Sequence, residues 1–172
     1  ILNVTAPAVI NSQPADALFC GSGNAIFTVA ATGTGLTYQW QLSTDGGTAY
    51  NNITTATTAT LNVNATGTSF NDYRYRVLVA NTGGVCGTLT SGAAKLSVNP
   101  LPVVVLSVAP YTKLFPGLKT TVTATVTPAG GTYTWKRNGI TLPTTASTII
   151  ADVDSLGDYK LTVTGAGGCV GE

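Results

Sequence analysis

The sequence predicts an all-β protein that contains two copies of one folding unit. Only 9% of the 172 residues are charged, and the β-branched residue threonine is abundant, a composition that favours strands over helices. Short runs in which apolar and polar residues alternate are separated by clusters of glycine, proline and asparagine. No window of a dozen residues carries the apolar stripe and the capping residues of a helix.

The alternating runs of the first copy define its expected strands. These runs cover residues 25–31, 36–42, 60–64 and 73–80. In the last of them, Arg74 and Arg76 alternate with apolar residues, as in a strand with one face in water and the other in a core. The same alternation accounts for the nearest approach to a basic cluster in a chain of net charge +1, so we expect no nucleic-acid partner.

The second copy is recognised by segments that match the first. FTVAATGTGLTYQWQ at 27–41 matches VTATVTPAGGTYTWK at 122–136, which places Trp135 in the position of Trp40. Two further matches pair YRVLV at 75–79 with YKLTV at 159–163, and GGVCG at 83–87 with GGCVG at 167–171. The repeat indicates two modules of one fold.

The residues at the start of the chain and at the junction of the two copies indicate a longer array of modules. Residues 95–104, KLSVNPLPVV, close the first copy and open the second, and the chain begins with the same Leu-x-Val strand and proline-marked junction. We therefore expect residues 1–5 to be the last strand of a preceding module, residues 6–99 to form module 1, and residues 100–172 to form module 2 without its final strand. A strand from beyond Glu172 or from another chain is expected to cover the open edge.

Tryptophan and tyrosine positions indicate the kind of sandwich. Trp40 and Trp135 stand where an immunoglobulin-like β-sandwich carries its core tryptophan, on strand C. Tyr75 and Tyr159 match the tyrosine of strand F, although an apolar residue replaces the cysteine that follows two positions later. The chain thus resembles tandem immunoglobulin-like β-sandwiches, and the resemblance implies that these four aromatic residues anchor the cores.

Two turns of the second copy support the resemblance. Asn138-Gly139 is typical of the tip of a two-residue hairpin, because a type I′ turn needs positive φ at both central positions. The segment SLGDY at 155–159 resembles the Asp-x-Gly-x-Tyr corner of these sandwiches, with serine in the aspartate position.

The cysteines give a narrower resemblance. Cys20 stands before GSGNAIFTVAATGTGLTYQWQ, and Cys86 lies in a later GVCGT segment. This arrangement resembles the immunoglobulin-like repeats of large secreted and cell-surface proteins, including adhesins, of gliding bacteria that use type IX secretion. The resemblance implies a Cys20–Cys86 disulfide, for which two buried free thiols are the alternative. Cys169 is then the unpaired cysteine, either free or joined to a cysteine beyond Glu172.

The same resemblance implies export and one modification site. Asp154-Ser155-Leu156 fits the Asp-Ser/Thr-apolar acceptor pattern of O-glycosylation in those bacteria, so Ser155 is a candidate acceptor. A solvated turn without a modification is the competing interpretation of this segment.

The sequence contains no catalytic constellation that we can identify. It has no histidine, which removes the commonest general base and most zinc sites. Asp152, Asp154 and Asp158 form one acidic group, but their spacing does not supply the ligands of a calcium-binding loop. We expect no enzyme activity, no cofactor and no metal. No apolar run approaches the roughly 20 residues of a membrane-spanning helix.

The expected function is therefore structural. We expect a spacer or adhesion module of a large exported cell-surface protein or filament, with an extracellular or cell-surface location. Its expected partners are the neighbouring immunoglobulin-like modules of the same chain, and surface glycans or other filament chains are further candidates. The alternative is a carbohydrate-binding accessory module of a secreted polysaccharide-degrading enzyme, in which Tyr50, Phe70 and Tyr111 would offer exposed rings unless they pack under loops.

Overall fold

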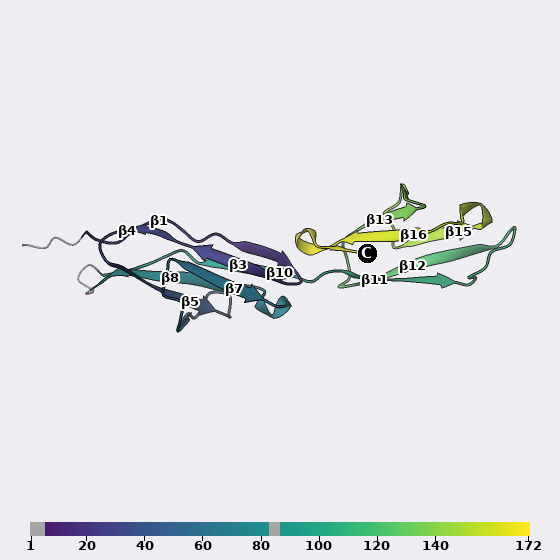
Figure 1. Ribbon diagram of the computed structural model, residues 1–172. Helices are drawn as coiled ribbons and strands as arrows, with labels where there is room; N and C mark the ends of the chain where they lie inside the picture. The colour runs from purple at the N-terminus through teal and green to yellow at the C-terminus, as the bar shows by residue number, and fades with distance from the viewer. Residues whose placement is uncertain (1–5, 83–86) are drawn as a thin grey trace, which may run out of the picture. The chain divides into compact units, whose positions relative to one another are not determined.

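The prediction of an all-β chain is confirmed. The computed structural model describes residues 6–82 and 87–172, so the strand expected at residues 1–5 lies outside the described part of the chain. The described residues form strands joined by turns and by short 3-10 helices. The chain divides into two compact units, Ile1–Asn99 and Pro100–Glu172, each with its own sheets and its own hydrophobic core (Figure 1).

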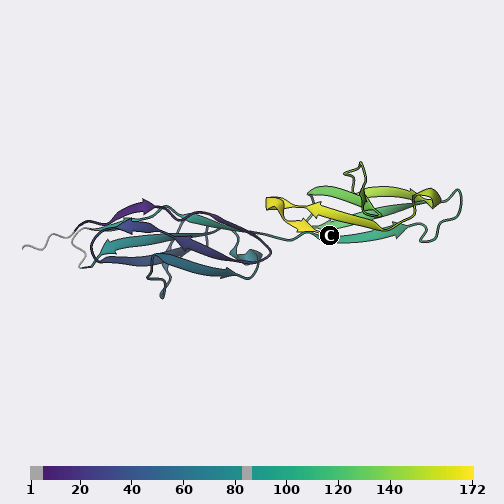
Figure 2. The same ribbon diagram turned by 45° about the horizontal axis from the view of Figure 1, so that its top comes forward.

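The first unit contains strands β1 to β10. In chain order the elements are β1 Val9–Ser12, β2 Ala17–Cys20, β3 Gly23–Thr28, β4 Ala30–Thr32, β5 Leu36–Ser43, β6 Asn51–Asn52, β7 Thr60–Ala65, η1 Thr68–Phe70, β8 Tyr73–Asn81, β9 Thr88–Thr90 and β10 Ala94–Asn99. One layer is a sheet in the order β2-β10-β8-β5-β6, with β9 also on β8. The pairs β3-β7 and β1-β4 form the other layer (Figure 2).

The run at residues 25–31 forms two strands where the alternation predicted one. β3 ends at Thr28 and β4 begins at Ala30, and the buried Val29 lies between them. The Val29 N–H donates to the carbonyl oxygen of Ala59 at 3.0 Å. Because of this break, β3 pairs with β7, whereas β4 pairs with β1.

Aromatic side chains fill the core of the first unit. Trp40 on β5 is fully buried, and its indole N–H donates to the Thr58 carbonyl oxygen at 2.9 Å. Phe27 on β3 stacks on Tyr75 of β8 with ring centroids 4.8 Å apart. Burial raises the pKa of the Tyr75 hydroxyl to about 12, with a smaller contribution from Tyr73. Aromatic contact between β3 and β8 thus joins the two layers of the first unit.

A buried asparagine ties the start of the first unit to its sheet. Asn81, at the end of β8, is 3% exposed. Its Oδ1 accepts from the Ala8 N–H at 2.9 Å, and its Nδ2 donates to the carbonyl oxygens of Ala6 at 2.9 Å and Thr34 at 2.6 Å. One side chain therefore satisfies three backbone groups from two separate segments.

Replacing this asparagine tests that role. We expect Asn81→Ala to lower the free energy of unfolding by about 2–3 kcal/mol, because the backbone groups that it satisfies lose their partner. Urea unfolding of the purified chain measures the change. The matched control is Asn62→Ala on the exposed face of β7, which should change stability by less than about 0.5 kcal/mol. Equal effects of the two substitutions would contradict the proposed tie.

The second unit contains strands β11 to β17. The elements are β11 Val103–Ala109, β12 Lys119–Thr127, β13 Thr132–Arg137, β14 Ile140–Thr141, β15 Thr148–Asp152, η2 Val153–Ser155, β16 Tyr159–Thr164, η3 Ala166–Gly168 and β17 Val170–Gly171. One layer has the order β11-β12-β15, and the other has the order β14-β13-β16-β17. Trp135 of β13 is fully buried between them, and its indole N–H donates to the Ala146 carbonyl oxygen at 2.8 Å.

The two turns singled out in the second copy have the expected geometry. Asn138 and Gly139 join β13 to β14 with φ of 50° and 82°, so both central positions of the hairpin are left-handed. The hydroxyl of Tyr159 donates to the carbonyl oxygen of Ser155, four residues upstream. This bond closes the corner between η2 and β16, as in the tyrosine corner of immunoglobulin-like sandwiches.

Candidate functional site

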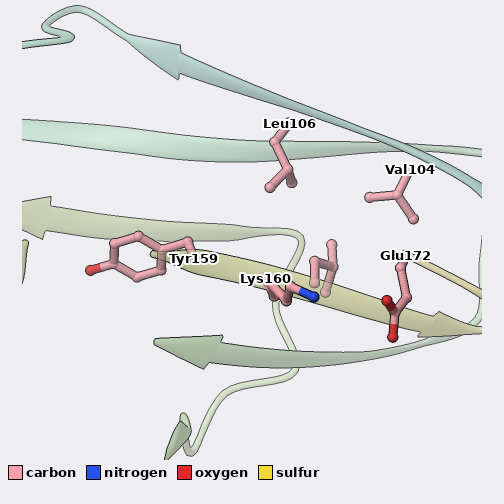
Figure 3. Close-up of a pocket in the computed structure, with 6 residues that line it drawn as sticks. Val104, Leu106, Tyr159, Lys160 and Glu172 are labelled. Carbon is pink, nitrogen blue, oxygen red and sulfur yellow. The ribbon is translucent and has the colours of Figure 1, made fainter. Parts of the chain in front are cut away.

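An apolar groove opens between the two layers of the second unit. It has a volume of about 260 Å³. Its lining residues are Val104, Leu106, Tyr159, Lys160, Leu161 and Glu172. Figure 3 shows Val104 and Leu106 on β11, across the groove from Tyr159, Lys160 and Glu172.

The walls of the groove come from strands that face each other. Leu106 pairs with Ala124 of β12, and this register turns it toward the inside of the sandwich together with its neighbours Val104 and Val108. Yet Leu106 is 39% exposed and Val108 is 43% exposed. The inner face of β11 is therefore only partly covered. The apolar side chains of this face line one wall of the groove. The two charged residues of the groove, Lys160 and Glu172, are exposed.

The described residues provide no metal centre. In residues 6–82 and 87–172, no group of three or more histidine, cysteine, aspartate or glutamate side chains is placed to hold an ion. The same part of the chain contains no helix with the length and hydropathy needed to cross a membrane. The groove itself is lined mainly by apolar side chains.

The three aromatic residues considered for a sugar-binding platform do not form one. Two of their rings contact other side chains of the first unit, and the third belongs to the second unit. The guanidinium of Arg76 lies 3.8 Å from the ring centroid of Tyr50 and covers that ring face. Phe70 packs against Tyr73, with ring centroids 5.5 Å apart, and belongs to the margin of the first core. Tyr111 is 43% exposed but lies in the second unit. The three rings do not define one described surface.

Sequence reasoning missed a polar network on the outer face of the first unit. Besides covering Tyr50, Arg76 donates from Nε to Oε1 of Gln41 at 2.7 Å. The Gln41 amide donates in turn to Oδ1 of Asn52 at 2.8 Å. The outward positions of β5 and β8 were visible as alternation, but nothing in the sequence showed which residues of the loop before β6 would meet them.

The cysteines require a correction. The disulfide-bonded cysteines of the described chain are Cys20 and Cys169, so the prediction that Cys169 is unpaired is wrong. Cys169 is also fully buried, directly before β17. Cys86, the expected partner of Cys20, lies outside the described residues.

The acidic segment of the second unit forms a closed turn. The Asp152 N–H donates to Oγ of Ser155 at 2.7 Å, and that hydroxyl lies 2.8 Å from Oδ1 of Asp152. These reciprocal contacts cap η2, and Ser155 is half-buried. A glycan on Ser155 would remove the donor of this bond. O-glycosylation of Ser155 stays a prediction, and it has a structural cost that the sequence did not reveal.

The Ser155 contact makes this turn sensitive to acid. Hydrogen bonding from Ser155, with Lys119 contributing less, lowers the pKa of the Asp152 carboxyl below its usual value. The stabilisation is therefore present above the ordinary aspartate pKa, and it is lost as the pH falls through the lowered value. We expect Ser155→Ala to raise the pKa of Asp152, as followed by carboxyl-carbon NMR, while Ser107→Ala on β11 leaves it unchanged. An unaltered Asp152 titration in Ser155→Ala would refute this assignment.

Comparisons with known proteins place the chain in a family and in a fold. A family model described as a domain of unknown function (DUF8696) matches residues 9–100, just over half of the chain. The chain belongs to this family. A search of curated protein sequences gave no match.

Solved structures with similar folds carry several immunoglobulin domains. An I-band fragment of titin superposes with a TM-score of 0.61 at 16% identity, over 96% of this chain and 63% of the titin chain. The N-terminal four immunoglobulin domains of a Dscam1 isoform give 0.54 at 14% identity, over 96% of this chain and 44% of the Dscam1 chain. The chain thus spans less than two thirds of either structure. At these identities the likeness establishes the fold, which is that of tandem immunoglobulin-like sandwiches. It carries no information about activity.

Proposed function

We propose that this chain is a structural and adhesion segment of a large multi-domain protein, in which immunoglobulin-like modules act as spacers. The observation that carries the proposal is that each unit encloses its own tryptophan-centred core, around Trp40 and around Trp135. A unit of this kind needs no ligand to be folded, and it can be repeated along a chain. The similarity to multi-domain immunoglobulin structures supports the same role.

The proposal includes the module boundaries and the partners. Residues 6–99 and 100–172 are two modules, and the principal partners are neighbouring modules of the same kind. The linker Asn99-Pro100-Leu101-Pro102 is short, and its two prolines restrict the backbone, which suits a spacer.

The proposed location is extracellular or on the cell surface. Disulfides persist in oxidising compartments, and Cys20 and Cys169 are disulfide-bonded. The low charge and the abundance of threonine suit an exposed surface. The resemblance to adhesin repeats of gliding bacteria extends the proposal to export by type IX secretion. Catalysis is not part of it, because the groove of the second unit offers apolar side chains in place of converging acid and base groups.

The carbohydrate-binding alternative has weaker support. An aromatic sugar platform needs open ring faces on one surface, whereas Arg76 covers Tyr50 and Tyr73 packs against Phe70. Adhesion through other chains of a filament does not require such a platform. We therefore retain the structural role alone.

Independent folding of the two units tests the proposal. We expect Trp40→Ala to destabilise the first unit by about 3–5 kcal/mol, because it empties the centre of that core. The chain has two tryptophans, so the fluorescence of this variant reports Trp135 alone. Its emission should stay that of a buried indole under conditions in which hydrogen exchange shows the first unit unfolded.

The reciprocal variant is the control. Trp135→Ala should unfold the second unit and leave the exchange protection of β5 and β8 intact. If either substitution unfolds both units together, the chain is one cooperative domain and the modular role is wrong.

A further inference from the structure

An arginine occupies a core-facing position in the second unit. Arg137 lies two residues after the buried Trp135 on β13, and it pairs with Tyr159 of β16. Alternate residues of a strand share a face, so Arg137 is turned toward the other layer, as Trp135 is. In the first unit the same register pairs Leu42 with Tyr75, and Leu42 packs against the first core. A position that is apolar in the first unit thus carries a cation in the second.

Arg137 lines an open pocket to which both layers of the second unit contribute. The pocket has a volume of about 430 Å³. β15 contributes Thr148, Ile149 and Ile150 to its wall, and residues 142–144, which follow β14, contribute a leucine, a proline and a threonine. A pocket of this volume can hold a small molecule.

The ring of Tyr159 is part of the pocket wall. At the matching place in the first unit, Phe27 stacks on Tyr75, which is 2% exposed. Val122 stands in the position of Phe27 in the second copy, and Tyr159 is only partly buried. The Tyr159 hydroxyl is held by the carbonyl oxygen of Ser155, so the ring has a fixed place beside Arg137.

The guanidinium of Arg137 has no counter-ion in the part of the chain that the structure describes. The ion pairs found there join Asp72 to Arg74 and to Lys95, all in the first unit. Neither an ion pair nor a hydrogen bond joins the Arg137 side chain to another of the described residues. A partly buried cation without a partner carries a desolvation cost, which a ligand with a negative charge would offset.

The pocket suits one negative charge attached to an apolar body. Its charged lining residue is Arg137, whereas Lys136 and Lys160 pair with each other at outward positions of β13 and β16. A guanidinium donates two parallel N–H bonds to a carboxylate. Leu142 and Ile149 pack against the second core and line the same pocket, so they offer apolar contact beside that charge.

We propose that the second unit binds a small organic carboxylate in this pocket. The guanidinium of Arg137 binds the carboxylate, and Leu142 and Ile149 contact the apolar body of the ligand. The first unit has no such site, because Leu42 fills the position of Arg137. This binding goes beyond the spacer role, and neither depends on the other.

Titration of the full chain with sodium hexanoate tests the proposal. NMR follows the side-chain N–H of Arg137 and the methyl groups of Leu142 and Ile149 while sodium chloride keeps the ionic strength constant. We expect saturable shifts with a dissociation constant on the order of 1 mM, which is the affinity range of a ligand of this size. Hexanamide has the same body without the charge, and it should bind at least about tenfold more weakly.

Substitutions of Arg137 test the residue itself. Arg137→Leu introduces the side chain that the first unit carries at this position. It should weaken hexanoate binding at least about tenfold and should not lower the thermal midpoint of the second unit, because a cation without a partner is removed. Arg137→Gln keeps a hydrogen-bonding side chain without the charge, and it should weaken binding as well.

The matched control is Lys136→Leu. This substitution removes a positive charge at the neighbouring outward position of β13. The dissociation constant for hexanoate should stay within about twofold, because salt screens an exposed charge outside the pocket. Equal weakening by Lys136→Leu and Arg137→Leu would show a general attraction of anions to the chain, and the proposal would be wrong.

Three further results would overturn the proposal. Hexanoate that shifts none of these signals leaves no ligand site, and hexanamide that binds as tightly as hexanoate leaves an apolar pocket without a role for the charge. If inorganic phosphate displaces hexanoate at equal concentration, the pocket takes any anion and the apolar body has no part. None of these outcomes bears on the structural role, which the Trp40 and Trp135 variants test.

Discussion

Each unit of this chain depends on one buried indole that is both apolar contact and hydrogen-bond donor. Trp40 and Trp135 are fully buried, and each donates its N–H to a backbone carbonyl of a loop, at Thr58 and at Ala146. A buried indole N–H without a partner would cost free energy, so the loop must hold its carbonyl in place. Each tryptophan therefore packs between the two layers of its unit and also holds a loop in place. That loop precedes β7 in the first unit and β15 in the second.

The two units use different means to join their layers around this common centre. In the first unit, Phe27 stacks on Tyr75, and Asn81 ties the entry segment to the sheet. In the second unit, the Tyr159 hydroxyl instead closes the corner at Ser155, and an apolar groove opens between the two layers. The repeat therefore preserves the core tryptophan, while the edges and corners of the sandwich vary.

The surface chemistry agrees with a role in assembly. Few residues are charged, and on the outer face of the first unit the Arg76 guanidinium contacts two neutral groups, the Gln41 amide and the Tyr50 ring, in place of a carboxylate. Contacts of this kind are less sensitive to salt than ion pairs.

The sequence by itself determined the features that depend on local patterns. Alternation located the strands at residues 36–42, 60–64 and 73–80, the internal repeat assigned Trp135 to the position of Trp40, and Asn138-Gly139 specified its turn. Each of these signals lies within a few neighbouring residues. Only the tertiary structure decided that Cys20 lies at the opposite end of the sheet from the end of β8. It alone brought Asn81 to the entry segment and Arg76 onto Tyr50. Those contacts depend on which strand ends meet in space, and residues far apart in the chain carry no local pattern that records it.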